Sequence, residues 1–176
     1  RTWPNLLGFE GGDGEENLSN GSLDMPLYDV TFPYIRQVSG PADYTPGAMR
    51  SAARGEAVRV ARAGASQGTR AHQVALYVVV DQPLGILCDS PSLYEKEPLT
   101  TSYIASIPTV FDQTVIPCGS VGEYIVTARQ KDGVWYLGGL TNWKARDVNV
   151  DLSFLGEGSW KAVIYRDGPN AEYFGD

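Results

Sequence analysis

The sequence predicts an α/β region followed by an all-β region. Over residues 1–106, short apolar runs alternate with segments of helical periodicity, which indicates parallel strands joined by helices. Over residues 107–176 the apolar period falls to two, which indicates antiparallel strands. We therefore expect two domains, divided near residue 106.

The first strand–loop unit lies at the amino end. Residues 3–7 predict a short buried strand, and the glycine-rich loop after it carries Glu10, Asp13, Glu15 and Glu16. Carboxylates this close repel one another unless a cation or a proton offsets their charge. Hard oxygen ligands favour calcium, and a carboxyl beside an ion and a sugar favours acid–base work on a glycosidic bond. The loop alone leaves open a simpler interpretation, a solvated acidic turn.

The helix of this first unit and the strand of the second come next. The apolar residues of the helix recur at helical spacing from Leu27 to Val38, with Asp29 as the expected N-cap and an end near Gly40. We expect a very short strand over residues 42–45, which places Asp43 at a strand end. Asp43 is equally consistent with a turn cap.

An irregular stretch comes next, in which one helical turn is expected over residues 48–54. Thr69 can cap a helix that runs to about residue 80. His72, the single histidine, lies beside the apolar stripe of this helix, so we interpret it as structural. A buried strand is expected over residues 84–88, and Ser90 and Pro91 then open a helix to residue 106 with a break near Pro98.

Each of the three expected strands ends near an acidic residue. In a β/α barrel, the loops after the strands carry the chemistry. Three units cannot close an eight-stranded barrel, so the chain is expected to be the last part of one, with the other strands before Arg1.

The last region predicts an antiparallel meander. A strand over residues 121–130 and its partner over 134–141 flank a hairpin turn at residues 131–133. A further strand is expected over 148–154, where apolar and polar residues alternate. Another is expected over 160–165, where the chain returns after a turn at residues 156–158.

Composition excludes some partners. The net charge of −7 argues against nucleic acid, and no apolar run reaches the roughly 20 residues of a membrane span. Cys88 and Cys118 have neither a CxxC spacing nor a nearby histidine, which favours free thiols over a disulfide or zinc.

The motifs resemble those of glycoside hydrolase family 97, the calcium-dependent α-glucosidases and α-galactosidases. The resemblance extends over nearly the whole chain. Its blocks include RTWPNLL (1–7), DVTFPYIR (29–36), GPADYTPGAM (40–49), SQGTRAHQVALYVV (66–79), LCDSPSLY (87–94), IPTVFDQT (107–114), GEYIVTAR (122–129) and WYLGGLTNW (135–143), together with the spacing of Glu10 and Glu16.

The resemblance implies a (β/α)₈ catalytic barrel followed by a C-terminal β-sandwich-like domain. This chain would hold the last part of the barrel, over residues 1–106, and most of the C-terminal domain, over residues 107–176. It implies Glu16 as general acid, and Glu10 and Glu16 as calcium ligands. Asp43 and Tyr44 are expected substrate contacts. The implied partners are an oligosaccharide with a terminal α-linked glucose or galactose and the remainder of the same enzyme, and the implied location is the periplasm.

The chain departs from the family pattern at two positions, where Tyr28 replaces a histidine and Phe111 a tryptophan. The base or nucleophile is expected before Arg1, so the residues do not choose between inversion and retention. Two further hypotheses are a carbohydrate-binding or structural β-module with a barrel remnant, and a non-catalytic homologue.

Overall fold

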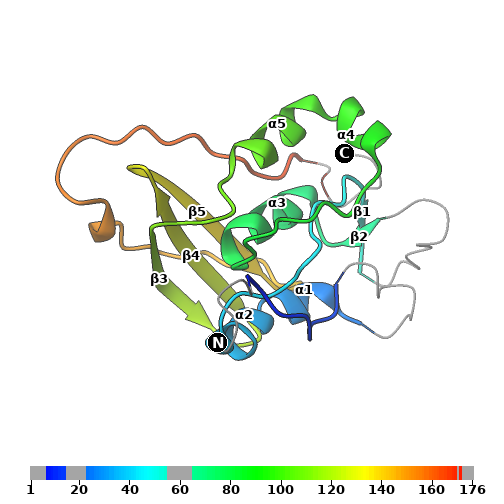
Figure 1. Ribbon diagram of the computed structural model, residues 1–176, viewed down its shortest axis with the longest axis horizontal. Coiled ribbons are helices and arrows are strands. Elements are labelled where there is room, and N and C mark those ends of the chain that lie inside the picture. The colour runs from blue at the N-terminus through cyan, green and yellow to red at the C-terminus, as the bar shows by residue number, and fades with distance from the viewer. Residues whose placement is uncertain (1–6, 15–22, 55–64, 170, 172–176) are drawn as a thin grey trace.

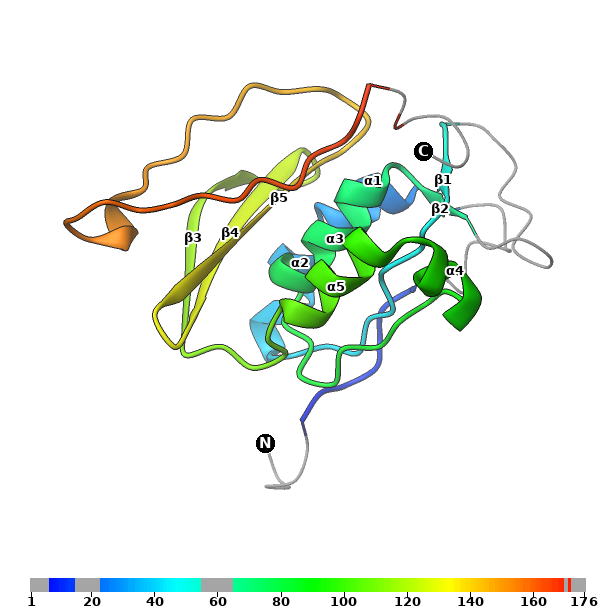
Figure 2. The same ribbon diagram turned by 90° about the horizontal axis from the view of Figure 1, so that it is seen from above.

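The computed structural model describes residues 7–14, 23–54, 65–169 and 171. A three-stranded antiparallel sheet, in the order β3-β4-β5, lies on one side of the molecule. Helix α3 packs against it, and α5 lies on the other side of α3 (Figures 1 and 2). Among these residues no helix has the length and apolar character needed to cross a membrane.

The amino-terminal helices are short, and each has a proline in its first turn. Helix α1, Met25–Asp29, begins at the N-cap Asp24, whose carboxylate accepts from the Leu27 amide at 3.2 Å. Helix α2, Phe32–Ile35, and the 3₁₀ turn η2, Gln37–Ser39, follow. The prediction of Asp29 as the cap was wrong: Pro26 in the first turn sets the start of α1, and Asp29 is its buried last residue.

The middle helices match the sequence-based expectation closely. Helix α3, Arg70–Val79, is capped by the Thr69 hydroxyl, which accepts from the His72 amide at 3.3 Å. Helices α4, Pro91–Lys96, and α5, Pro98–Ser106, follow with the expected break at Pro98. The cap at Thr69 and the break at Pro98 are confirmed.

Three antiparallel strands of eight residues each form the centre of the second region. Strand β3, Gln113–Ser120, pairs with β4, Tyr124–Lys131, across a bulge, and β4 pairs with β5, Val134–Thr141, in continuous register. The turn between β4 and β5 places Asp132 at φ 50° and Gly133 at φ 80°, as a tight hairpin of two positive-φ residues requires. This hairpin is confirmed.

Helix α3 packs directly on β5. A Cβ at Gly138 would lie 2.9 Å from both the Ala75 carbonyl oxygen and the Val78 Cβ, so the absence of a side chain permits the close approach. The core has two clusters. One unites α1, α2 and α3 with Ile125 and Leu140 of the sheet, and the other unites α3 with α4 and α5.

Several expected strands are wrong. Residues 148–154 contain only the start of the 3₁₀ turn η3, Ser153–Leu155, and residues 160–165 form no strand. Alternation predicts a strand only where a neighbouring edge supplies hydrogen bonds, and neither segment pairs with a strand among the described residues. Residues 84–88 also form no strand, because Gly85 turns the chain at φ 61°.

The region expected to belong to a barrel contains short parallel pairings. Strand β1, Ser51–Ala52, pairs in parallel with β2, Ser66–Gln67, where a helical turn was expected over 48–54. The expected strand over 42–45 is reduced to one parallel bridge, between Phe9 and Ala42. The expected strand over residues 3–7 lies outside the described residues except for its last position.

Candidate active-site loop

The acidic loop starts beside the segment that contains Asp43. The Phe9 amide donates to the Pro41 carbonyl at 3.3 Å, and the Asp43 amide donates to the Phe9 carbonyl at 2.9 Å. Since Phe9 and Ala42 pair in parallel, Glu10 and Asp43 each follow a paired residue at the same end of two adjacent segments. The pairing therefore brings two of the predicted site positions to one edge.

Arg36, the residue after helix α2, holds the backbone of this loop. One guanidinium nitrogen donates to the Phe9 carbonyl at 2.8 Å and to the Glu10 carbonyl at 2.9 Å. The other terminal nitrogen donates to the Ser39 hydroxyl at 3.0 Å, which fixes the side chain from behind. Arg36 also places a cation next to the acidic loop and offsets part of its charge.

Helices α1 and α2 hold the far end of the loop as well. The Tyr28 hydroxyl accepts from the Asp13 amide at 2.8 Å. Burial raises the pKa of Tyr28, and the hydrogen bond from Asp13 opposes that rise. A Cβ at Gly12 would lie 2.5 Å from the Phe32 ring, so only glycine lets the loop pass this close to the helix.

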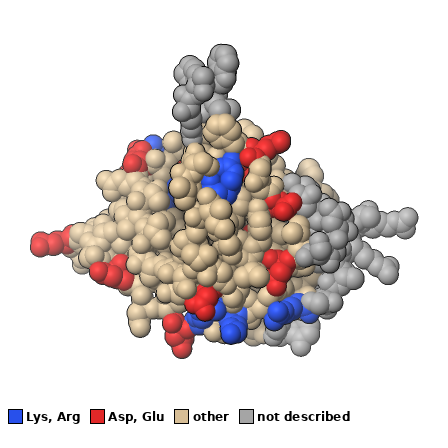
Figure 3. Space-filling model, turned by 90° about the horizontal axis from the view of Figure 1, so that it is seen from below, with Lys and Arg blue, Asp and Glu red and all other residues tan. Residues whose placement is uncertain are grey.

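The carboxylates of Glu10 and Asp13 are the exposed acidic groups of the described part of the loop. Glu10 is exposed, and within the described ranges its side chain has no hydrogen bond or ion pair. The described residues contain no group of three His, Cys, Asp or Glu side chains that could hold a metal ion. Glu16, the expected general acid, lies outside the described residues, as does Glu15. Figure 3 shows acidic side chains scattered over one face of the molecule rather than gathered.

The two predicted substrate contacts, Asp43 and Tyr44, differ in whether their polar atoms are free to bind a sugar. Asp43 is half-buried, and one of its carboxylate oxygens is buried without a hydrogen-bond partner among the described atoms. Tyr44 is 2% exposed, and its hydroxyl donates to Asp29. A contact between Asp43 and a sugar stays a prediction, whereas the Tyr44 hydroxyl is already used inside the protein.

A buried polar network lies behind the loop. The Asp29 carboxylate accepts from Tyr44 on one oxygen and lies 2.8 Å from His72 Nε2 on the other. The Asp29 side chain is fully buried, and that of His72 is 9% exposed. His72 is thus a satisfied structural residue, as interpreted from the sequence. The sequence carried no local sign of its partner, which lies 43 positions away.

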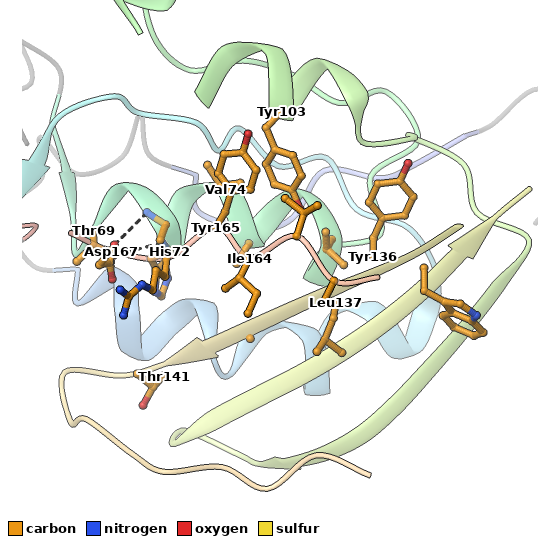
Figure 4. Close-up of a pocket in the computed structure, with 18 of the residues that line it drawn as sticks. Thr69, His72, Val74, Tyr103, Tyr136, Leu137, Thr141, Ile164, Tyr165 and Asp167 are labelled. Carbon is orange, nitrogen blue, oxygen red and sulfur yellow. Dashed lines mark hydrogen bonds between the residues drawn. The ribbon is translucent and has the colours of Figure 1, made fainter. Parts of the chain in front are cut away.

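A separate cavity of about 1100 Å³ opens between helix α3, strand β5 and the carboxyl-terminal segment. Figure 4 shows Ile164, Tyr165 and Asp167 of that segment facing the helix and the strand. Asp167 accepts from the Thr69 hydroxyl at 2.9 Å, and Tyr165 stacks on Tyr103 with the ring centres 3.7 Å apart. Sequence analysis did not predict this cavity, because it depends on where the unpaired segment lies.

Comparison with known proteins places these features in one family. Residues 110–175 match the family model for "Glycosyl-hydrolase 97 C-terminal, oligomerisation". The chain is 53% identical over 177 aligned residues to a retaining alpha-galactosidase of Bacteroides thetaiotaomicron, covering 99% of this chain and 27% of that protein. The chain belongs to glycoside hydrolase family 97.

Two further comparisons agree with this family 97 assignment. A probable retaining alpha-galactosidase of Streptomyces bingchenggensis is 31% identical over 97% of this chain and 24% of its own length. A family 97 enzyme from a Pseudoalteromonas species, solved in complex with panose, superposes with a TM-score of 0.74 at 30% identity, covering 90% of this chain and 25% of that chain. The family 97 chain described here thus spans about a quarter of the length of these relatives.

Proposed function

We propose that this chain is the carboxyl-terminal part of a retaining α-galactosidase, an exo-acting glycoside hydrolase. The 53% identity to a retaining alpha-galactosidase over almost the whole chain carries the proposal. It favours galactose over glucose and retention over inversion, which the residues alone had left open. In the proposed protein, residues 1–106 complete a (β/α)₈ barrel and residues 107–176 form most of the β-domain after it.

In the proposed reaction Glu16 is the general acid. A retaining glycosidase needs one carboxyl group to protonate the leaving oxygen and a second to attack the sugar. Glu16 lies three residues after Asp13 in the sequence, and its assignment as the acid rests on the family resemblance. The nucleophile would come from the part of the protein outside this chain.

Calcium is the proposed cofactor, with Glu10 and Glu16 among its ligands. The donor chemistry fits, because the loop offers carboxylate oxygens and calcium takes six to eight oxygen ligands at roughly 2.3–2.6 Å. Glu10 is exposed and unpaired among the described residues. The remaining ligands would come from outside them. When bound, the ion would polarise groups at the scissile bond.

The remaining assignments rest on position and resemblance. Asp43 is the proposed sugar-binding residue of this chain, because its unpartnered oxygen lies at the edge that also carries Glu10. Tyr44 would support Asp43 from the core. Export to the periplasm is proposed from the family resemblance alone.

The test is hydrolysis by the complete protein of matched aryl α-galactosides and α-glucosides, with and without a calcium chelator. We expect a preference for the galactoside, a first-formed product with retained anomeric configuration by proton NMR, and loss of activity when calcium is removed. Inactivity on both sugars, or an inverted product, would overturn the proposal.

A second candidate function is non-catalytic sugar binding by the cavity between α3, β5 and the carboxyl-terminal segment. Aromatic side chains in its wall, including Tyr103, Trp135 and Trp160, favour it, because sugar rings can pack on aromatic faces. Titration of this chain with galactose, followed by tryptophan fluorescence, tests this candidate. A Trp135→Ala variant that binds as tightly as the unmodified chain would exclude it.

A further inference from the structure

We infer that Arg36 is the positioning residue of the acidic loop, and that it sets the direction of the Glu10 carboxylate through the backbone. This inference rests on the proposed function for its link to calcium, but its structural part stands on the described contacts. Among the described residues, the Arg36 side chain has no hydrogen bond or ion pair to the Glu10 carboxylate. It acts on the carbonyl oxygens of Phe9 and Glu10.

The geometry supports a clamp rather than an incidental contact. A single guanidinium nitrogen serves two consecutive carbonyls at 2.8 and 2.9 Å. Consecutive carbonyls usually point in different directions along an extended chain, so shared donation fixes the local backbone angles. Gly11, next in the chain, has φ 109° and lies beside the same guanidinium, since its Cβ position is 3.7 Å from Arg36 Nε.

Arg36 is itself fixed on both sides. Its second terminal nitrogen donates to the Ser39 hydroxyl at 3.0 Å, and that hydroxyl donates to the Arg36 carbonyl at 2.9 Å. Helix α2 is anchored in the core through Phe32, which is 4% exposed. The clamp therefore transmits the rigidity of the core to a loop whose own side chains point to solvent.

Electrostatics supports the same role. Glu10 and Asp13 lie on a short loop without a cation of its own, and Arg36 supplies a positive charge that does not compete for the carboxylate of Glu10. The carboxylate is left available while the backbone is held. Outer groups that orient a metal ligand typically change metal affinity or activity about 10–100-fold when removed.

The test uses the complete protein with three variants, Arg36→Met, Arg36→Lys and the control Arg166→Met, which removes an exposed arginine elsewhere. We expect Arg36→Met to weaken calcium binding in calorimetry by about tenfold or more, with faster amide exchange at Phe9 and Asp13. Arg36→Lys restores part of the affinity, because lysine keeps the charge but lacks the fixed fork. Arg166→Met changes neither measurement.

The outcomes separate the two proposals. If the unmodified protein binds no calcium, the calcium assignment fails and amide exchange alone decides the role of Arg36. If amide exchange at Phe9 and Asp13 is equally fast in Arg36→Met and in the unmodified protein, Arg36 does not hold the loop. This result would overturn the inference whatever the activity of the variant. Faster amide exchange at Phe9 and Asp13 in Arg36→Met, together with unchanged calcium affinity, overturns the link to Glu10.

Discussion

The Nε atom of Arg129 on β4 lies 2.6 Å from the carbonyl oxygen of Val78 at the end of helix α3. The same guanidinium donates to the Val79 carbonyl at 3.3 Å and lies 3.6 Å from the Asp81 carboxylate. Burial lowers the pKa of Arg129, while the charge of Asp81 opposes that shift. Arg129 thus joins the helical region to the sheet by satisfying the carbonyl end of α3.

Replacing Arg129 with methionine is expected to destabilise the chain. The methionine fills similar volume but leaves the Val78 and Val79 carbonyls without their donors, at a cost of about 3 kcal/mol in the free energy of unfolding. Chemical denaturation of the variant measures it. The control Arg166→Met should change that free energy by less than about 0.5 kcal/mol. Equal stability of both variants would show that Arg129 does not link the two regions.

The Asp29–His72 contact predicts a second stability effect. Asp29→Ala removes the acceptor of both Tyr44 and His72 in a buried site, and we expect a loss of about 3 kcal/mol. Thermal and denaturant unfolding measure the loss, with Asp147→Ala as an exposed control. A loss no larger than that of the control would mean that water replaces the Asp29 contacts without cost.

Two buried tyrosines predict sensitivity to alkali. Burial raises the pKa of Tyr94 to about 12 and also raises that of Tyr77. Both hydroxyls donate to carbonyls, of Gly47 and Pro46 respectively, and so must stay protonated in the folded chain. Because both folded pKa values lie above the ordinary value of 10.0, the contribution of both hydroxyls is complete below pH 10.0. The contribution of Tyr94 is lost as the pH rises through about 12, and that of Tyr77 is lost at still higher pH.

The measurement is an alkaline titration of the tyrosines by ultraviolet absorbance, alongside circular dichroism. We expect a group of tyrosines to ionise only as the structure unfolds, and Tyr94→Phe to shrink that group. The opposite result would be ionisation of all tyrosines near their ordinary pKa with the fold intact.

Local signals predicted the parts of the fold that local chemistry determines. The Thr69 cap, the break at Pro98 and the turn at residues 131–133 each follow from the side chains at those positions. Strand predictions failed where pairing decides the outcome. Residues 148–154 alternate in sequence but have no partner edge among the described residues.

The candidate site was only partly predictable for the same reason. Glu10 was predicted as a site residue from its spacing and the glycines around it, and this role stays a prediction. The structure pairs the preceding residue, Phe9, with Ala42, which precedes Asp43. Arg36 was missed, because its contact with the Glu10 carbonyl spans 26 positions and no periodicity encodes it.

The most direct test of the account is the rate of Glu16→Gln in the complete protein, with an alkyl galactoside whose leaving group needs protonation. We predict a fall of about 10²–10⁴-fold in kcat/KM for the alkyl galactoside, with Glu15→Gln close to the unmodified value. The kcat/KM of an activated aryl galactoside should fall far less, because its leaving group needs no proton in the first step. Turnover of the alkyl galactoside by Glu16→Gln at nearly the unmodified rate would contradict the account.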